Sequence, residues 1–291
     1  MSIDKKRTPY LLLAPAVLTL LVTIGYPIGY NLYISLFDWR MLESTTPINF
    51  VGLDNYVNFF RNPDMLHSFF ITIEYTILGV ALEFFLGLIL ALILFEKTRG
   101  FKVFRLLLLV PIMATPLVIG LIWKLMWHAE FGIINYFLSF FGQSKTAWLA
   151  HPNTAFIAIV IVEVWKYTSF IFLIIYAGLQ VLPSDPYEAA TIDGATYWNK
   201  LFRITLPLIR GPMLVAVVFR MIFTFRVFDQ IYALTRGGPS DATMVMSLLI
   251  YREGFAQWRP GSGAAMSVIL IMITLFFALL LIKAIYKKSE L

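Results

Sequence analysis

Eight ionisable side chains fall inside long apolar segments of this sequence, and their types could do chemistry there. They are Glu74, Glu83, Lys124, Glu163, Lys166, Arg220, Arg226 and Asp229. A charge at the middle of a bilayer costs roughly 2.5–3.5 kcal/mol on insertion scales unless it is paired or hydrated, so such residues mark a functional site by default. Three kinds of chemistry are open to them: a structural ion pair, hydrogen bonds to a polar solute, and proton transfer.

The depth of each charged residue in the membrane, counted along its apolar segment, predicts which of these side chains lie close together. The fourth apolar segment begins near Thr154, so Glu163 lies about 14 Å into it at a rise of 1.5 Å per residue. The fifth segment runs the opposite way and is expected to end near Thr235, which places Arg226 at a similar depth. We therefore expect Glu163 to pair with Arg226, either as a structural ion pair or within a polar cavity. The number of polar groups in these two segments favours the cavity.

Membrane helices must position these residues. The chain has 291 residues, of which 59% are hydrophobic and 14% charged, and this composition excludes an ordinary soluble domain. Six apolar segments reach the roughly 20 residues that a helix needs to cross a bilayer: residues 10–37, 69–95, 104–127, 154–180, 212–235 and 264–286. The first is too long for a signal peptide and lacks a cleavage site. The sequence predicts an all-α polytopic membrane protein with six transmembrane helices, forming one domain over residues 1–291.

Basic residues sort by loop and predict the orientation. Thirteen lie in alternate connections: Lys5, Lys6, Arg7, Lys97, Arg99, Lys102, Arg105, Lys200, Arg203, Arg210, Lys283, Lys287 and Lys288. The other connections hold six: Arg40, Arg61, Lys145, Arg236, Arg252 and Arg259. Because cytoplasmic loops carry the excess of Lys and Arg, we expect both termini and the loop at about 183–211 to be cytoplasmic. The basic residues do not gather into one patch, so nucleic acid is not an expected partner.

The loop at 183–211 carries signals for two short helices joined by a bend. Asp185 and Pro186 suit the start of the first helix, with Glu188 close to a capping-box position. Gly194 can end that helix, because glycine adopts the left-handed conformation without steric cost. Thr196 can cap a second helix from Tyr197 to about Ile204, which Pro207 would stop. An ordinary capped helix pair is the structural alternative.

The same stretch resembles the EAA loop of ABC-importer membrane subunits. The matching residues are Glu188, Ala189, Ala190, Asp193, Gly194, Ile204, Leu206 and Pro207. In that family the loop docks on the ATPase, so the resemblance implies that these residues couple this chain to an ATP-binding subunit.

Other segments resemble the carbohydrate-importer branch of that family, the MalF- and UgpA-like permeases. They are FVGLDNYVNFF at 50–60, FGIINYFLSFFG at 131–142, Trp148-Leu149 and FDQIYALTRGGP at 228–239. The resemblance extends from about Val51 to Met266 and lacks the extra helices and large outer domain of the maltose protein. It implies a permease in the bacterial cytoplasmic (inner) membrane for a sugar, oligosaccharide or sugar derivative. The implied partners are a second homologous permease, two ATP-binding subunits and an extracytoplasmic binding protein, with ATP bound by the partner and no cofactor in this chain.

The resemblance also implies a substrate site. Its sugar-contacting positions fall on Glu163 to Tyr167 and on the next helix, and with Arg226 from the depth argument the set is Glu163, Lys166, Tyr167, Arg220, Phe223, Thr224, Val227 and Arg226. A neutral-sugar site would favour amides and small residues at these positions. The charges, Lys166 and Arg220 above all, leave room for an anionic sugar.

Two other classes of function are weighed against this one. A membrane enzyme would need a nucleophile with a base or a metal cluster, but His67, His128 and His151 lack ligand spacing and the sequence has no cysteine. The chain also has no phosphate-binding G-x-x-x-x-G-K-[ST] loop, so another polypeptide must hydrolyse ATP. A secondary carrier driven by protons through Glu163 or Asp229 is the alternative that the charges alone allow. Such a carrier would not need the EAA loop.

Overall fold

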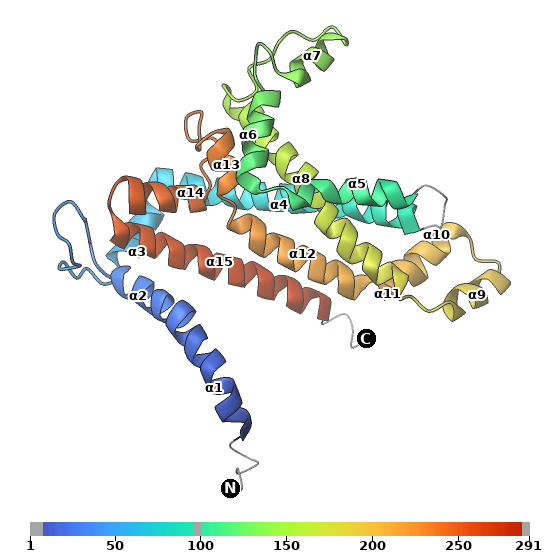
Figure 1. Ribbon diagram of the computed structural model, residues 1–291, viewed down its shortest axis with the longest axis horizontal. Coiled ribbons are helices and arrows are strands. Elements are labelled where there is room, and N and C mark those ends of the chain that lie inside the picture. The colour runs from blue at the N-terminus through green and yellow to red at the C-terminus, as the bar shows by residue number, and fades with distance from the viewer. Residues whose placement is uncertain (1–7, 96–100, 287–291) are drawn as a thin grey trace. The chain divides into compact units, whose positions relative to one another are not determined.

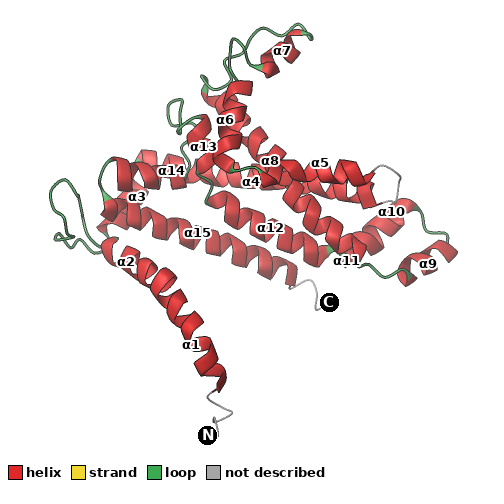
Figure 2. Ribbon diagram, viewed as in Figure 1, coloured by secondary structure: helices red, strands yellow, loops and turns green. Residues whose placement is uncertain are grey.

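The chain is folded into helices, as Figures 1 and 2 show. The computed structural model describes residues 8–95 and 101–286. Within these ranges the regular structure is helical apart from one isolated bridge between Phe37 and Phe50, which confirms the all-α prediction. Ser289 and seven of the basic residues counted above lie outside the described residues: Lys5, Lys6, Arg7, Lys97, Arg99, Lys287 and Lys288.

Six stretches of helix correspond to the six predicted spans. Four are single stretches long and apolar enough to cross a membrane: Leu12–Ile34, Pro63–Phe95, Pro152–Gln180 and Pro260–Lys283. The first span lies in α1 (Thr8–Leu20), the π-helical turn Leu21–Gly25 and α2 (Tyr26–Ile34). The other three lie in α4 (Pro63–Phe95), α8 (Pro152–Gln180) and α15 (Pro260–Tyr286). The other two are bent pairs, Val103–Met113 with Pro116–Met126 and Tyr197–Leu208 with Arg210–Phe225. The described chain therefore has four such spans, or six if each bent pair crosses once.

The third span is not the continuous helix expected over residues 104–127. It consists of α5 (Phe101–Met113) and α6 (Pro116–Met126), whose axes differ by 100°. Thr115 has an extended backbone, with φ −63° and ψ 136°, because the proline that follows disfavours the helical conformation there. Pro116 then starts α6, where its missing N–H costs no hydrogen bond.

The fifth span ends earlier than the expected residue 235. Helix α12 (Arg210–Phe225) stops at Phe225, and the short helix α13 (Asp229–Leu234) begins after a break of three residues. The break contains neither glycine nor proline. The N–H groups of Arg226 and Val227 donate to the carbonyls of Phe223 and Thr224 at the end of α12. The carbonyl of Val227 accepts a hydrogen bond from the hydroxyl of Ser247.

The chain has two compact units, each described by itself. One comprises residues up to 66 with residues 249–271. In it the side chain of Asn55, on α3 (Asp54–Arg61), donates to the carbonyls of Ser35 and Phe37 at 2.9 and 2.8 Å. Trp39 packs with Ile34 and Ala264 in a small apolar cluster. Two short helical segments precede α15: α14 (Met246–Tyr251) and the π-helical turn Arg252–Ala256. The boundary between the two units falls within α14.

The other unit comprises residues 67–248 and residues from 272 onward, and it holds the predicted site. Glycines let its helices approach closely. A Cβ on Gly87 of α4 would lie 2.8 Å from Ile171 of α8, and one on Gly178 of α8 would lie 2.6 Å from Pro212 of α12. Helices α6 and α13 lie side by side in Figure 1, with Gly120 against Ala233. These contacts hold α4, α6, α8, α12 and α13 around the charged residues.

Candidate functional site

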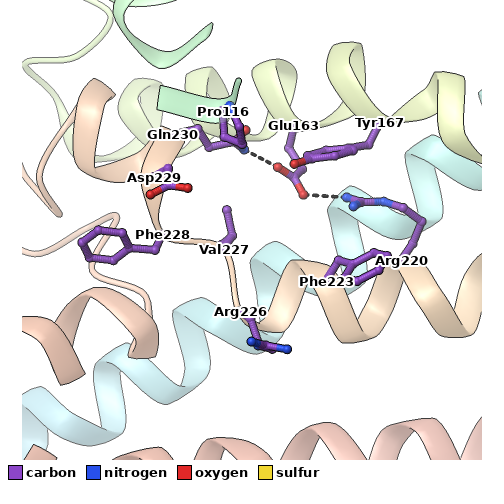
Figure 3. A pocket seen from close by; sticks show the side chains of 10 residues that line it. All are labelled: Pro116, Glu163, Tyr167, Arg220, Phe223, Arg226, Val227, Phe228, Asp229 and Gln230. Carbon is purple, nitrogen blue, oxygen red and sulfur yellow. Dashed lines mark hydrogen bonds and ion pairs between the residues drawn. The ribbon is translucent and has the colours of Figure 1, made fainter. Parts of the chain in front are cut away.

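A buried arginine forms the centre of the predicted site. Arg220 of α12 is 1% exposed and lies between two carboxylates (Figure 3). Its Nε and Nη2 donate to Oε2 and Oε1 of Glu83, on α4, at 2.6 and 2.8 Å. Nη2 also donates to Oε1 of Glu163, on α8, at 2.6 Å. Both carboxylates are buried as well, so three helices are joined by one desolvated ion cluster.

The two oxygens of Glu163 bind opposite sides of the break in the fifth span. Oε1 accepts from Arg220 and from the hydroxyl of Thr224, which are both on α12, at 2.6 and 3.3 Å. Oε2 accepts from the side-chain amide of Gln230 on α13, and from the hydroxyl of Tyr75 on α4 at 3.0 Å. Figure 3 shows Glu163 between Arg220 and Gln230. Since a carboxylate offers about four acceptor positions, Glu163 is saturated in this arrangement.

The expected pair of Glu163 with Arg226 is wrong. Glu163 pairs with Arg220, and Arg226 is an exposed residue just past the end of α12. In Figure 3 the Arg226 side chain points away from Glu163. The depth argument assumed a fifth helix continuous to residue 235, whereas the break after Phe225 moves Arg226 off the helical path.

Lys166 is buried beside this cluster without joining it by a hydrogen bond. It is 2% exposed, one helical turn beyond Glu163 on α8. Its Nζ lies 4.8 Å from the ring centroid of Tyr167, and the guanidinium of Arg220 lies 3.8 Å from the same centroid. Within the described part of the chain Lys166 makes no ion pair. Counted as formal charges, Lys166 and Arg220 together offset Glu83 and Glu163.

A pocket of about 410 Å³ opens at the break, a size typical of small-molecule sites. Its lining is Pro116, Glu163, Tyr167, Arg220, Phe223, Arg226, Val227, Phe228, Asp229 and Gln230 (Figure 3). Six of the eight predicted substrate residues are therefore brought together. Lys166 and Thr224 do not line this pocket; they are buried behind it.

Three residues of the site are absent from the set predicted from the sequence: Glu83, Tyr75 and Gln230. Glu83 is ionisable and near the middle of the predicted second span, so the depth argument used for Glu163 could have found it. Tyr75 and Gln230 carry no charge at neutral pH, and the search for ionisable residues could not detect them. Both complete the hydrogen bonds of Glu163.

The polar loop after α8 has the predicted bend. Helix α9 (Asp185–Ile192) ends before Gly194, whose φ of +73° is in the left-handed region. The hydroxyl of Thr196 accepts from the backbone of Asn199 at 3.4 Å and caps α10 (Tyr197–Lys200). The second helix extends past the expected end at about Ile204. It continues through the π-helical turn Leu201–Thr205 and α11 (Leu206–Leu208) and ends one residue after Pro207.

Hydrogen bonds tie the two helices of this loop together. Lys200 Nζ donates to the hydroxyl of Thr191 at 2.8 Å, and the hydroxyl of Tyr187 donates to that of Thr205 at 2.9 Å. Large apolar side chains on the loop are exposed nevertheless: Ile192, Tyr197, Trp198 and Phe202. The loop is thus internally braced and presents an apolar surface.

The segment between α6 and α8 is a hairpin built around one buried asparagine. Asn135, on α7 (Ile133–Ser139), donates to the carbonyls of Ala129 and Thr146 at 2.9 Å each and accepts from the indole of Trp148 at 3.0 Å. Lys145 binds Glu130 at 2.9 Å and lowers the pKa of that carboxyl. Several aromatic side chains of this hairpin are exposed, among them Phe131, Phe137 and Phe141.

Comparison with known proteins gives three findings. Residues 83–289 match the model of the family described as "Binding-protein-dependent transport system inner membrane component". The chain is 39% identical over 274 residues to the trehalose/maltose transport system permease protein MalF of Thermococcus litoralis, covering 94% of this chain and 92% of the relative. It is 36% identical over 280 residues to the sulfoquinovosyl glycerol transport system permease protein SmoG of Agrobacterium fabrum, covering 96% and 90%.

A solved structure shares the fold. It is a bacterial alginate ABC transporter in complex with an alginate pentasaccharide-bound periplasmic protein. One chain of it superposes with a TM-score of 0.83 at 22% identity, covering 96% of this chain and 94% of that one.

Proposed function

Because this chain belongs to the family of binding-protein-dependent transport system inner membrane components, we propose that the pocket at the break in its fifth span is part of the path of a sugar, an oligosaccharide or a sugar derivative. The chain is a permease subunit of an ABC importer. The observation that carries the proposal is the 39% identity, over nearly the whole length of both chains, to a permease for trehalose and maltose. Sugar hydroxyls suit a pocket lined by charged groups, an amide and an aromatic ring.

The permease works with partners that supply energy and substrate. By analogy with the alginate transporter, an extracytoplasmic binding protein delivers the sugar. A second homologous permease completes the membrane path, and two ATP-binding subunits hydrolyse ATP. The chain itself is a translocator and binds no cofactor.

The loop from Asp185 to Leu208 is the part that couples to an ATP-binding subunit. Its exposed apolar side chains offer a docking surface, and its internal hydrogen bonds let it move as one body. Tyr197–Leu208 leads into α12 across a bend of 62°. Because α12 carries Arg220, a movement of the loop reaches the buried ion cluster through a short, direct connection. Closure of the ATPases would then shift the helices around the pocket between inward- and outward-facing arrangements.

The family is a component of the inner membrane, and we place both termini and the coupling loop on the cytoplasmic side. A cysteine scan tests this orientation, because the chain has no cysteine of its own. Ser144→Cys, in the exposed hairpin, should react with a membrane-impermeant thiol reagent in intact cells. Asn199→Cys, exposed on the coupling loop, should react only after the membrane is permeabilised. Ser289→Cys should behave like Asn199→Cys.

Labelling after permeabilisation is the control for accessibility of each cysteine. The reverse pattern, with Asn199→Cys labelled in intact cells, would place the loop away from ATP. That result would overturn the coupling role and the proposed function with it.

A further inference from the structure

The charged groups in the pocket and behind it fall into an inner set and a rim. The inner set is Glu83, Glu163, Arg220 and Lys166, each at most 2% exposed. Counted as formal charges, its two carboxylates and two cations sum to zero. Arg220 donates to both carboxylates, and Glu163 has its acceptor positions filled by Arg220, Thr224, Gln230 and Tyr75. The inner set therefore has little net charge to offer a ligand.

The rim consists of one cation and one anion beside the break. Arg226 and Asp229 both line the pocket and are both exposed. Among the described residues neither makes an ion pair or a side-chain hydrogen bond. They lie on either side of Val227 and Phe228 in the sequence, and both line the pocket. Within the pocket an anion is attracted by Arg226 and repelled by Asp229.

The remaining lining fits an uncharged ring. Phe223 is 49% exposed at the pocket and offers an apolar surface. Arg226 supplies donors only and Asp229 acceptors only, whereas a hydroxyl group can serve both. A polyhydroxylated molecule without net charge therefore uses all three residues at once.

We propose that this permease carries a neutral saccharide and that the opposed charges of Arg226 and Asp229 select it against anionic sugars. The proposal rests on the proposed function and narrows its substrate class. The relatives and structural neighbours do not settle that class, since their names include neutral trehalose and maltose as well as alginate and a sulfoquinovosyl glycerol. It also replaces the expectation that Lys166 and Arg220 leave room for an anion, because Arg220 is bonded to both carboxylates and Lys166 does not line the pocket.

The reaction rates of a cationic and an anionic thiol reagent measure the balance of charge in the pocket. Val227→Cys places the only cysteine of this chain at the break. In the assembled transporter, this cysteine would be treated with the cationic reagent trimethylammonioethyl methanethiosulfonate or the anionic reagent sulfonatoethyl methanethiosulfonate. Mass spectrometry of this chain gives the rate of modification by each reagent. Each rate is then divided by the rate of the same reagent with a free thiol in solution. The normalised rates should agree within about threefold, since the nearby charges cancel.

Two further variants give the matched controls. Adding Asp229→Asn should favour the sulfonate reagent by roughly tenfold, and adding Arg226→Gln should favour the ammonium reagent by about as much, because each leaves one unit charge unopposed. Both residues are exposed, so neither change disturbs the buried cluster. A tenfold preference for the sulfonate before either change would overturn the proposal, and so would a ratio that neither change moves.

Protection by saccharides tests the substrate class without the binding protein. Trehalose or maltose at high concentration should slow the reaction of Val227→Cys with N-ethylmaleimide, and alginate tetrasaccharide should not. Stronger protection by alginate, or none by any saccharide, would refute the inference. The reagent assay needs neither substrate nor ATP, so balanced rates combined with no saccharide uptake would count against the proposed function and leave the charge balance standing.

Discussion

Arg220→Met should remove most of the assembled transporter. The substitution leaves Glu83 and Glu163 buried without their shared donor, and breaking a buried ion pair on one side typically costs about 3–5 kcal/mol. That is a large part of the roughly 5–15 kcal/mol that stabilises a typical domain. The yield of complex on size-exclusion chromatography and its midpoint of thermal unfolding measure the effect.

Arg226→Met is the matched control, because it is the same change six residues along the chain at an exposed side chain. It should assemble like the parent. The quadruple variant Glu83→Gln, Glu163→Gln, Lys166→Met, Arg220→Met removes both carboxylates and both buried cations and should regain much of the lost complex. If Arg220→Met instead assembles as well as Arg226→Met, the buried cluster does not hold the helices together.

Gly194→Pro should abolish uptake while the transporter still assembles. Gly194 has φ +73° and donates its N–H to the carbonyl of Thr191, whereas proline is fixed near φ −65° and has no N–H. The bend between α9 and α10 must therefore change. Nothing lies within 4 Å of a Cβ at this position, so the effect is conformational and not a clash. We expect uptake and substrate-stimulated ATPase activity to fall by at least about a hundredfold, equivalent to about 2.7 kcal/mol.

Gly142→Pro provides the matched control for that change. Gly142 has φ +75° and donates its N–H to the carbonyl of Ser139, and a Cβ on it would have nothing within 4 Å, but it lies in the hairpin after α7. Its replacement should strain the backbone equally and leave ATPase activity coupled to uptake. Normal uptake in Gly194→Pro would mean that the loop does not transmit motion.

The membrane spans could be predicted because apolar length is a property of the sequence alone. Four of the six predicted segments are single stretches of helix in the structure, with a π-helical turn inside the first. The proline at position 116 is a local signal for the bend before it. The size of the bend, 100°, has no local signal because it depends on the packing of α6 against α13. The break after Phe225 had no signal at all. A carbonyl in the break accepts a hydrogen bond from Ser247, twenty residues later, and such a long-range contact is not visible in the local sequence.

The sequence predicts which residues form the site better than it predicts which of them form ion pairs. Counting charges in apolar segments found Glu163 and Arg220, and the resemblance to known permeases added Phe223 and Val227, all of which line the pocket. The predicted ion-pair partner of Glu163 was wrong because its depth in the membrane was counted along a fifth helix that in the structure ends at Phe225. Which face of each helix points inward is a tertiary property. A neutral amide such as Gln230 gives no charge signal until the fold brings it to Glu163.

The central claim is that ATP hydrolysed by a partner drives a saccharide through this chain. The most direct test is uptake into vesicles that contain this permease with its partner permease and ATP-binding subunits, with the binding protein and radiolabelled trehalose or maltose outside. Uptake should require ATP inside the vesicles and should persist when the proton gradient is collapsed. Uptake that proceeds without ATP and follows an imposed proton gradient would contradict the account and favour a proton-driven carrier.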